Sequence, residues 1–317
     1  MAGITYKNTA RTVVGGTGGI GSDMRIRIPA VAAAALLALG LGAGQPTMAL
    51  AQSQGAAPAS TWKPPRGPDH VHPDLNGVWQ VLNTANYDVE PHGASAAMAF
   101  RPGPVIPVPA AQVVAMGAVG AVPPGPGVVV GGAIPYKPEA KAQRDDNRAH
   151  WLERDPEIKC YLPGVPRATY MPYPLRILQS DHGMVIAYEY ASAVRTLLFK
   201  DPGPAPVDSW MGQSVAHWEG DTLVVKVTGL NDQSWLDRAG NFHSDQMTVV
   251  ERYTLTSPMT IRYEAEITDP EVYAHPWKIE MTLYKAVGSD VTFGQFKCVE
   301  FVTELMYGDL RKQPLPH

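Results

Sequence analysis

The sequence predicts a mainly β protein: an antiparallel, up-and-down barrel of about eight to ten strands, with one helix ahead of the main run of strands. Three observations lead to this prediction. Short runs rich in β-branched and aromatic residues follow one another from Leu175 onward. Turn signals separate most of these runs by only a few residues, so neighbouring strands should pair antiparallel. A meander of that many strands must hide its edges, either by closing into a barrel or by splitting into a β-sandwich, which is the alternative.

The apolar runs and their boundaries give the elements in chain order. Turn-forming sequences such as Asp181-His182-Gly183 and Glu219-Gly220-Asp221 separate the strands. The predicted strands are Asn76–Leu82, Leu175–Gln179, Met184–Ala191, Val194–Phe199, Val215–Trp218, Thr222–Val227, Thr248–Leu255, Thr260–Thr268, Ile279–Lys285 and Thr292–Val302. One helix is predicted over Pro138–Asp155, because proline and glutamate suit its first turn and the dipeptide Asp-Pro ends it.

Composition excludes several classes of protein. The chain has 317 residues, a formal net charge of -4 and a mean hydropathy of -0.13. These values exclude a polytopic membrane protein, and the charge balance gives no sign of a nucleic-acid-binding surface. The 2 cysteines are too few for a disulfide scaffold or a cysteine-rich zinc module. We therefore expect a globular domain that binds no nucleic acid.

The N-terminal region is typical of a secretory signal. A basic segment at 24–27 precedes an apolar run at 28–41, and Ala49-Leu50-Ala51 fits the small-x-small cleavage rule before Gln52. Either residues 1–23 extend this signal, or Met24 is the true start. The apolar run is too short to anchor the chain in a membrane. We expect a periplasmic or secreted protein with no stable membrane anchor after cleavage.

Composition also divides the chain into segments. Residues 1–51 are the N-terminal extension and signal peptide, 52–73 a disordered linker, and 74–312 a single β-barrel domain. Residues 90–135 are an insertion of Ala, Val, Pro and Gly with almost no charge. We expect this insertion to lie over the surface or to be disordered. The alternative is an apolar lid or a partner-contact loop.

Charged residues recur on predicted strand faces that are otherwise apolar. Alternation along the strands places Glu189, Glu251 and Arg195 each on such a face, Glu189 together with Val185 and Ala187. A lone buried charge is costly, so these groups should pair with one another, lose their charge or bind a ligand. They either fill the barrel as an interior ion-pair network or supply a carboxylate of raised pKa for general acid–base catalysis. A register slip of one residue would instead place any of them in water.

The connection 231–245 gathers polar, acidic, aromatic and imidazole groups. A loop at a barrel mouth is where a ligand would be met. His243 is the candidate acid–base histidine, with Trp235 and Asp232 as candidate substrate contacts. The alternative for His243 is a surface or capping role.

Arg167 and Tyr170 lie in a stiff, proline-rich segment and could supply an anion-binding guanidinium and a phenol. No metal site is predicted, although His70 and His72 could touch one ion from the linker. No cofactor is predicted either. The glycine-rich run 15–21 precedes the signal peptide instead of joining a strand to a helix.

Cys160 and Cys298 are the only cysteines of the chain. Export to an oxidising compartment predicts one disulfide between them, which would tie the proline-rich segment to the last predicted strand. The alternative is a free, buried thiol at Cys298.

The runs Pro163–Arg167, Trp218–Val225 and His243-Ser244 followed by Glu251-Arg252 form a pattern of their own. This pattern resembles a large, poorly characterised family of exported bacterial proteins, over about Asp74 to Lys312. The resemblance implies a secreted, mainly β, lipocalin-like domain and brings no catalytic assignment.

Two functions remain open from the sequence. One is an exported barrel that binds a small, mostly apolar or aromatic molecule in its interior. The other is a periplasmic lyase, isomerase or hydrolase without a cofactor. In that enzyme Glu189, Glu251 or His243 would move a proton while Arg195 or Arg167 holds an oxyanion.

Overall fold

Alternation of inward and outward side chains builds the strands of this protein. In β11 (Thr248–Ser257) every second residue is buried, so Val249, Glu251 and Tyr253 all face inward. The predicted signal peptide and the first part of the predicted linker lie outside the described residues. The computed structural model describes, within one compact unit, residues 62–103, 105–116, 120–288, 291–296, 298 and 299.

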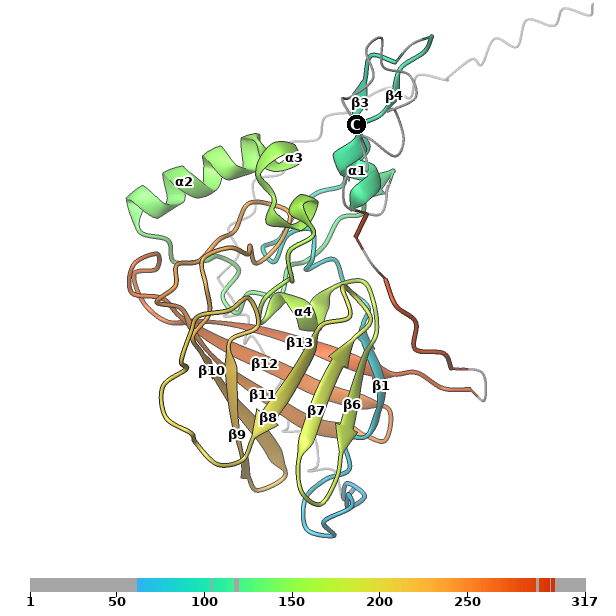
Figure 1. Cartoon of the computed structure of the whole chain (residues 1–317), viewed down its shortest axis with the longest axis vertical. Helices are drawn as coiled ribbons and strands as arrows, with labels where there is room; N and C mark the ends of the chain where they lie inside the picture. The colour runs from blue at the N-terminus through green and yellow to red at the C-terminus, as the bar shows by residue number, and fades with distance from the viewer. Residues whose placement is uncertain (1–61, 104, 117–119, 289–290, 297, 300–317) are drawn as a thin grey trace, which may run out of the picture. The chain divides into compact units, whose positions relative to one another are not determined.

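Nine strands close into a barrel, which confirms the predicted barrel over the β-sandwich (Figure 1). Their order around the barrel is β1-β13-β12-β11-β10-β9-β8-β7-β6. The largest fully buried side chains of its core include Trp79, Tyr253 and Tyr263. Besides β11, the strands are β1 (Gly77–Val81), β6 (Leu175–Gln179), β7 (Met184–Tyr188), β8 (Val194–Leu198), β9 (Gln213–Glu219), β10 (Thr222–Thr228), β12 (Thr260–Thr268) and β13 (Trp277–Lys285).

One neighbouring pair departs from the predicted up-and-down meander. β8 and β9 run parallel and pair only at Leu197↔Ser214 and Leu198↔Val215. Residues 199–212 carry the chain back along the barrel between them, as a parallel connection requires. The other 8 neighbouring pairs of the barrel are antiparallel. The barrel is therefore mostly, not wholly, antiparallel.

The charge-free segment 90–135 folds into two short ladders and a helix. β2 (Ser95–Ala96) pairs with β5 (Ala121–Val122), and β3 (Phe100–Arg101) pairs with β4 (Val108–Pro109). α1 (Ala111–Ala115) buries its alanines next to Cys298. The insertion is thus ordered in its described part, unlike the disorder that its composition allowed.

The predicted helix begins at Pro138 but divides into α2 (Pro138–Ala149) and α3 (Trp151–Arg154). His150 interrupts it with φ -119 and ψ 25, outside the helical region. A single 3-10 turn, η1 (Pro156–Lys159), follows. None of the helices among the described residues is long and apolar enough to cross a membrane.

The short helix α4 (Arg167–Tyr170) lies across one end of the barrel (Figure 1). All of its residues are buried, and the hydroxyl of Tyr170 donates to the carbonyl of Leu236 at 2.7 Å. The loop between β10 and β11 is thereby fastened over this end. α2, α3 and the insertion lie beyond the same end (Figure 1).

Residues 62–73 differ from the disordered linker expected there. Arg66 forms a β-bridge with Pro73, and its guanidinium lies 2.5 Å from the carboxylate of Asp221. The chain is therefore placed against the barrel before β1 begins.

The last predicted strand, Thr292–Val302, is not formed in its described part. Phe296 makes one isolated parallel bridge with Tyr190, and no further ladder pairing involves the described residues of this segment. Residues 300–302 lie outside the described residues.

Candidate functional site

The predicted charged groups Arg195 and Glu251 meet inside the barrel. Arg195 belongs to β8 and Glu251 to β11, and two strands separate them in the wall, so their contact crosses the interior. Nη2 of Arg195 lies 2.5 Å from Oε2 of Glu251, with side-chain exposures of 1% and 0%. Tyr253 and Tyr263 donate their hydroxyls to Oε1 of Glu251. The sequence prediction that these two charges face the interior is therefore correct.

This interior network satisfies its own hydrogen bonds. Five bonds leave the guanidinium of Arg195 and end on Glu251, Ser214 and Tyr188, which matches the five N–H groups that a guanidinium has. Although burial opposes the charge, Glu251 raises the pKa of Arg195 well above its ordinary value. No N–H group is left for a substrate oxyanion. The geometry favours an ion pair that fills the barrel over a catalytic carboxylate.

Glu189 does not join this network, and its predicted inward face was wrong. The inward-facing residues of β7 are Met184, Ile186 and Tyr188. The carboxylate of Glu189 instead accepts the backbone N–H of Gly294 at 3.0 Å, outside the barrel interior. Both alternating sets of side chains in this strand are apolar, so alternation alone could not separate them.

Arg167, a predicted ligand contact, is buried in an internal ion cluster. Its Nη2 lies 2.8 Å from Oε2 of Glu157, and its Nη1 lies 3.5 Å from Asp155. Arg238 binds the same Glu157 from Nε at 2.9 Å and from Nη2 at 2.8 Å. Neither Arg167 nor Tyr170 lines the cavities described below. Both belong to α4, the helix that covers one end of the barrel.

The loop 231–245 does bring predicted residues together. Asp232, Trp235 and His243 all line one cavity of about 480 Å³, opposite side chains of α2. This cavity lies at the surface next to the loop and not in the barrel interior.

His243 forms a buried pair with Ser234, which the sequence analysis did not single out. Nε2 of His243 lies 2.9 Å from Oγ of Ser234, and Nδ1 lies 3.0 Å from the carbonyl oxygen of Ser244. Because a carbonyl can only accept, Nδ1 carries the proton and Nε2 accepts from the serine hydroxyl. Ser234 is 2% exposed and does not line the cavity, so the pair holds the loop together.

Acidification should weaken the folded state through His243. Burial lowers the pKa of His243 from its ordinary 6.5, so below that pH the unfolded chain binds a proton that the folded chain refuses. The contribution of His243 to the free energy of unfolding is fully present above pH 6.5. It is lost as the pH falls from there through the lower pKa that His243 has in the folded protein. We expect His243→Gln to have a flatter profile than the wild type in urea unfolding between pH 7.5 and about 5. The exposed His217→Gln should keep the wild-type profile, and a His243→Gln profile as steep as the wild type would contradict the assignment.

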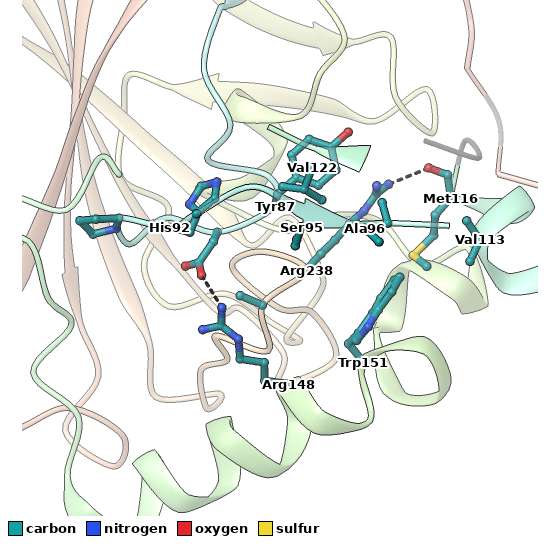
Figure 2. A pocket seen from close by; sticks show the side chains of 15 residues that line it. Tyr87, His92, Ser95, Ala96, Val113, Met116, Val122, Arg148, Trp151 and Arg238 are labelled. Atoms are coloured by element: carbon teal, nitrogen blue, oxygen red, sulfur yellow. Dashed lines mark hydrogen bonds and ion pairs between the residues drawn. The ribbon is translucent and has the colours of Figure 1, made fainter. Parts of the chain in front are cut away.

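A larger cavity, of about 550 Å³, lies outside the barrel strands (Figure 2). Its walls come from the residues after β1, the insertion 90–135, the α2–α3 pair and the loop between β10 and β11. The apolar lining includes Val113, Met116, Val122 and Trp151. The charged or ionisable side chains of the lining are Tyr87, Asp88, His92, Arg148 and Arg238. This volume falls within the usual range of small-molecule sites, about 300–1,000 Å³.

Asp237 shapes the loop that presents Arg238 to this cavity. Its Oδ1 accepts backbone N–H groups within its own loop, and its Oδ2 accepts the N–H of Val89 at 2.9 Å. Burial and the neighbouring Asp88 carboxyl raise the pKa of Asp237 to about 7. Gly240, at φ +88, lets the same loop pass close to α2, because a Cβ there would lie 2.7 Å from the backbone nitrogen of Arg148.

The polar side of the cavity holds Arg148 and His92 (Figure 2), together with Asp88, which pairs with Arg148. Oδ1 of Asp88 accepts the N–H of Glu90 at 3.0 Å, and its Oδ2 lies 3.3 Å from Nη2 of Arg148. Burial raises the pKa of Asp88 above its ordinary value. Nδ1 of His92 lies 2.8 Å from the carbonyl of Glu90 and so carries its proton. Nε2 of His92 is buried and has no hydrogen-bond partner among the described residues.

Arg238 crosses the middle of the cavity toward Met116. Its Nη2 donates to the carbonyl of Met116 at 2.7 Å, and its guanidinium lies 5.4 Å from the ring centre of Tyr87. Val113, Met116 and Trp151 lie on the side away from His92 (Figure 2). The cavity therefore has one apolar side and one polar side. Of its ionisable residues only Arg238 belongs to the loop 231–245, where the sequence had predicted contact with a ligand.

Cys160 and Cys298 form a disulfide, with Cα atoms 5.3 Å apart, as predicted. Cys298 packs against α1, whose residue Val113 lines the cavity of Figure 2. The bond therefore fastens a cavity wall to the turn after η1. Disulfides persist in oxidising compartments, in agreement with an extracytoplasmic protein.

In the described part of the chain, no group of three or more His, Cys, Asp or Glu residues is placed so that it could hold a metal ion.

No protein-family model, curated protein or solved structure matches the chain.

Proposed function

We propose that this protein binds a small, mostly apolar or aromatic molecule in the cavity of Figure 2, outside the cytoplasm. The observation that carries the proposal is the cavity of about 550 Å³, with an apolar side and a few convergent polar groups. Ligand sites have this character, because apolar walls supply affinity and a few polar groups fix orientation. The disulfide supports an oxidising location.

The proposed site replaces the barrel interior expected from the sequence. The Arg195–Glu251 pair and its tyrosine partners occupy the interior with side chains that bond to one another. The cavity outside the barrel instead has room for a ligand, with a volume of about 550 Å³.

A neutral aromatic dye tests the proposal. N-phenylnaphthylamine fluoresces in apolar surroundings, and we expect titration of the purified protein to show saturable binding. Ala96 is an exposed cavity-lining residue, so Ala96→Trp fills the cavity without disturbing the core. This variant should weaken dye binding by about tenfold or more, the loss of roughly 1.4 kcal/mol.

The control is Ala142→Trp, which adds the same side chain to an exposed position of α2 outside the cavity lining. It should bind the dye as the wild type does. If Ala96→Trp and Ala142→Trp both bind like the wild type, the dye lies elsewhere and the proposed site is wrong. Circular dichroism of both variants verifies that they are folded.

A second candidate, an acid–base enzyme, is favoured by one observation. Asp88 is a buried carboxyl that lines the same cavity, and burial raises its pKa, as is common for the acid–base groups of enzymes. Incubation with apolar and aromatic acids, alcohols and lactones, followed by mass spectrometry and isomer analysis, tests it. Conversion that disappears in Asp88→Asn while dye binding remains supports the enzyme, and binding without conversion supports a carrier.

A further inference from the structure

We propose that the ligand of the cavity is an organic anion: an apolar or aromatic body with one oxyanion group, such as a carboxylate, that binds the guanidinium of Arg148. This inference rests on the proposed binding function and narrows it to a chemical class. It follows from how the two arginines of the cavity are occupied.

Arg238 is already committed to other partners. Glu157 binds it through two hydrogen bonds, and the carbonyl of Met116 accepts a third. Its charge is therefore balanced next to the cavity wall. A ligand anion would gain little from a guanidinium whose partner is a buried carboxylate.

Arg148 is much less engaged. Its side chain is 52% exposed, and its contact with Asp88 at 3.3 Å is an ion pair without a well-aligned hydrogen bond. No other ion pair or hydrogen bond of its guanidinium occurs among the described residues. Arg148 therefore brings a positive charge and several free N–H donors to the edge of the cavity.

Asp88 is an incomplete partner for that guanidinium. Its Oδ1 accepts the backbone N–H of Glu90, so only Oδ2 faces Arg148. Guanidinium groups bind oxyanions best through two parallel hydrogen bonds to two oxygens. A ligand oxyanion can offer both oxygens, and burial raises the pKa of Asp88, which weakens its competition for the cation.

The position of Arg148 also suits an amphipathic anion. Arg148, which pairs with Asp88, lies on one side of the cavity, whereas Trp151, Val113 and Met116 lie on the other (Figure 2). A molecule with an apolar body and a terminal oxyanion would place the body against the apolar side and the charge at Arg148. A neutral molecule with the same apolar body would lose only the contact with Arg148.

Two dyes of the same body test the inference, because anilinonaphthalene sulfonate carries an anionic group that N-phenylnaphthylamine lacks. We expect Arg148→Gln to weaken binding of the sulfonate by about tenfold and to leave the neutral dye almost unchanged. Asp88→Asn should strengthen sulfonate binding by about threefold, since it removes the competing carboxylate. Arg154→Gln is the control, an arginine 45% exposed and paired with Asp146 but outside this cavity.

The outcomes separate the two proposals. If Ala96→Trp weakens both dyes but Arg148→Gln affects them equally, or affects neither, the organic-anion inference is overturned and the cavity remains a binding site. If Ala96→Trp leaves both dyes unaffected, the binding function itself fails. A loss of sulfonate binding in Arg154→Gln would assign the anion to the other cavity, next to His243, and would also overturn the inference.

Discussion

Glutamine in place of Glu251 lowers the free energy of unfolding by about 3–5 kcal/mol, because it leaves the guanidinium of Arg195 buried without a counter-charge. Urea unfolding, followed by tryptophan fluorescence, measures this loss. The double variant Arg195→Met with Glu251→Leu should recover most of it. Apolar side chains of similar volume can replace a buried ion pair at little cost.

Glu266→Gln is the matched control for this prediction. Glu266 belongs to β12, is 44% exposed and pairs with Lys278 at 3.2 Å, so its loss should cost less than about 1 kcal/mol. A similarly small effect for Glu251→Gln would mean that solvent reaches Arg195. The barrel would then have an open interior, and a ligand could bind there, as the sequence predicted.

Replacing both cysteines by serine lowers the free energy of unfolding by about 4–5 kcal/mol in the chain-entropy model. The bond joins residues 138 positions apart, so its loss frees a long loop in the unfolded chain. Urea midpoints of the wild type and of the double variant Cys160→Ser with Cys298→Ser give the difference. Because Cys298 packs beside α1, the variant should also bind the neutral dye less tightly.

A reductant provides the internal control for the disulfide. Dithiothreitol should lower the urea midpoint of the wild type to that of the double variant, and it should leave the double variant unchanged. An unchanged wild-type midpoint, with no free thiol before treatment and two after it, would show that the bond contributes nothing to stability.

The strands were predictable because their pattern is local. In β11 the alternation of apolar and polar residues assigns both the strand and the inward face of Glu251. β7 shows the limit of that signal. Both of its alternating sets are apolar, so the sequence placed Glu189 on the wrong face, and only pairing with its neighbours decides the register.

The cavity was not predictable in the same way. Asp88 follows β1, Arg148 belongs to α2 and Arg238 to the loop between β10 and β11, and no local pattern relates these three segments. Most of its apolar wall comes from the insertion 90–135, which the sequence predicted to lie over the surface or to be disordered. Arg167 is the converse case, because a motif predicted it as a ligand contact, whereas in the structure it is buried and pairs with Glu157 and Asp155.

The loop 231–245 was predictable in part. Asp232, Trp235 and His243 do lie around one cavity, as their spacing suggested. The hydrogen bond from Ser234 to His243 could not be expected, since a serine nine positions before a histidine has no fixed geometry in an irregular loop. The catalytic role predicted for His243 stays a prediction.

The number of strands itself has a consequence for how this barrel closes. Around a ring, up and down directions alternate without exception only when the count is even, so a ring of nine needs at least one parallel contact, and β8–β9 supplies it. β1 is antiparallel to both β6 and β13, which therefore point the same way. Without β1 those two strands would meet in a second parallel contact. The first strand of the sequence therefore closes the ring between β6 and β13. Until β13 has been synthesised, β1 has only one of its two partners and the sheet keeps two open edges.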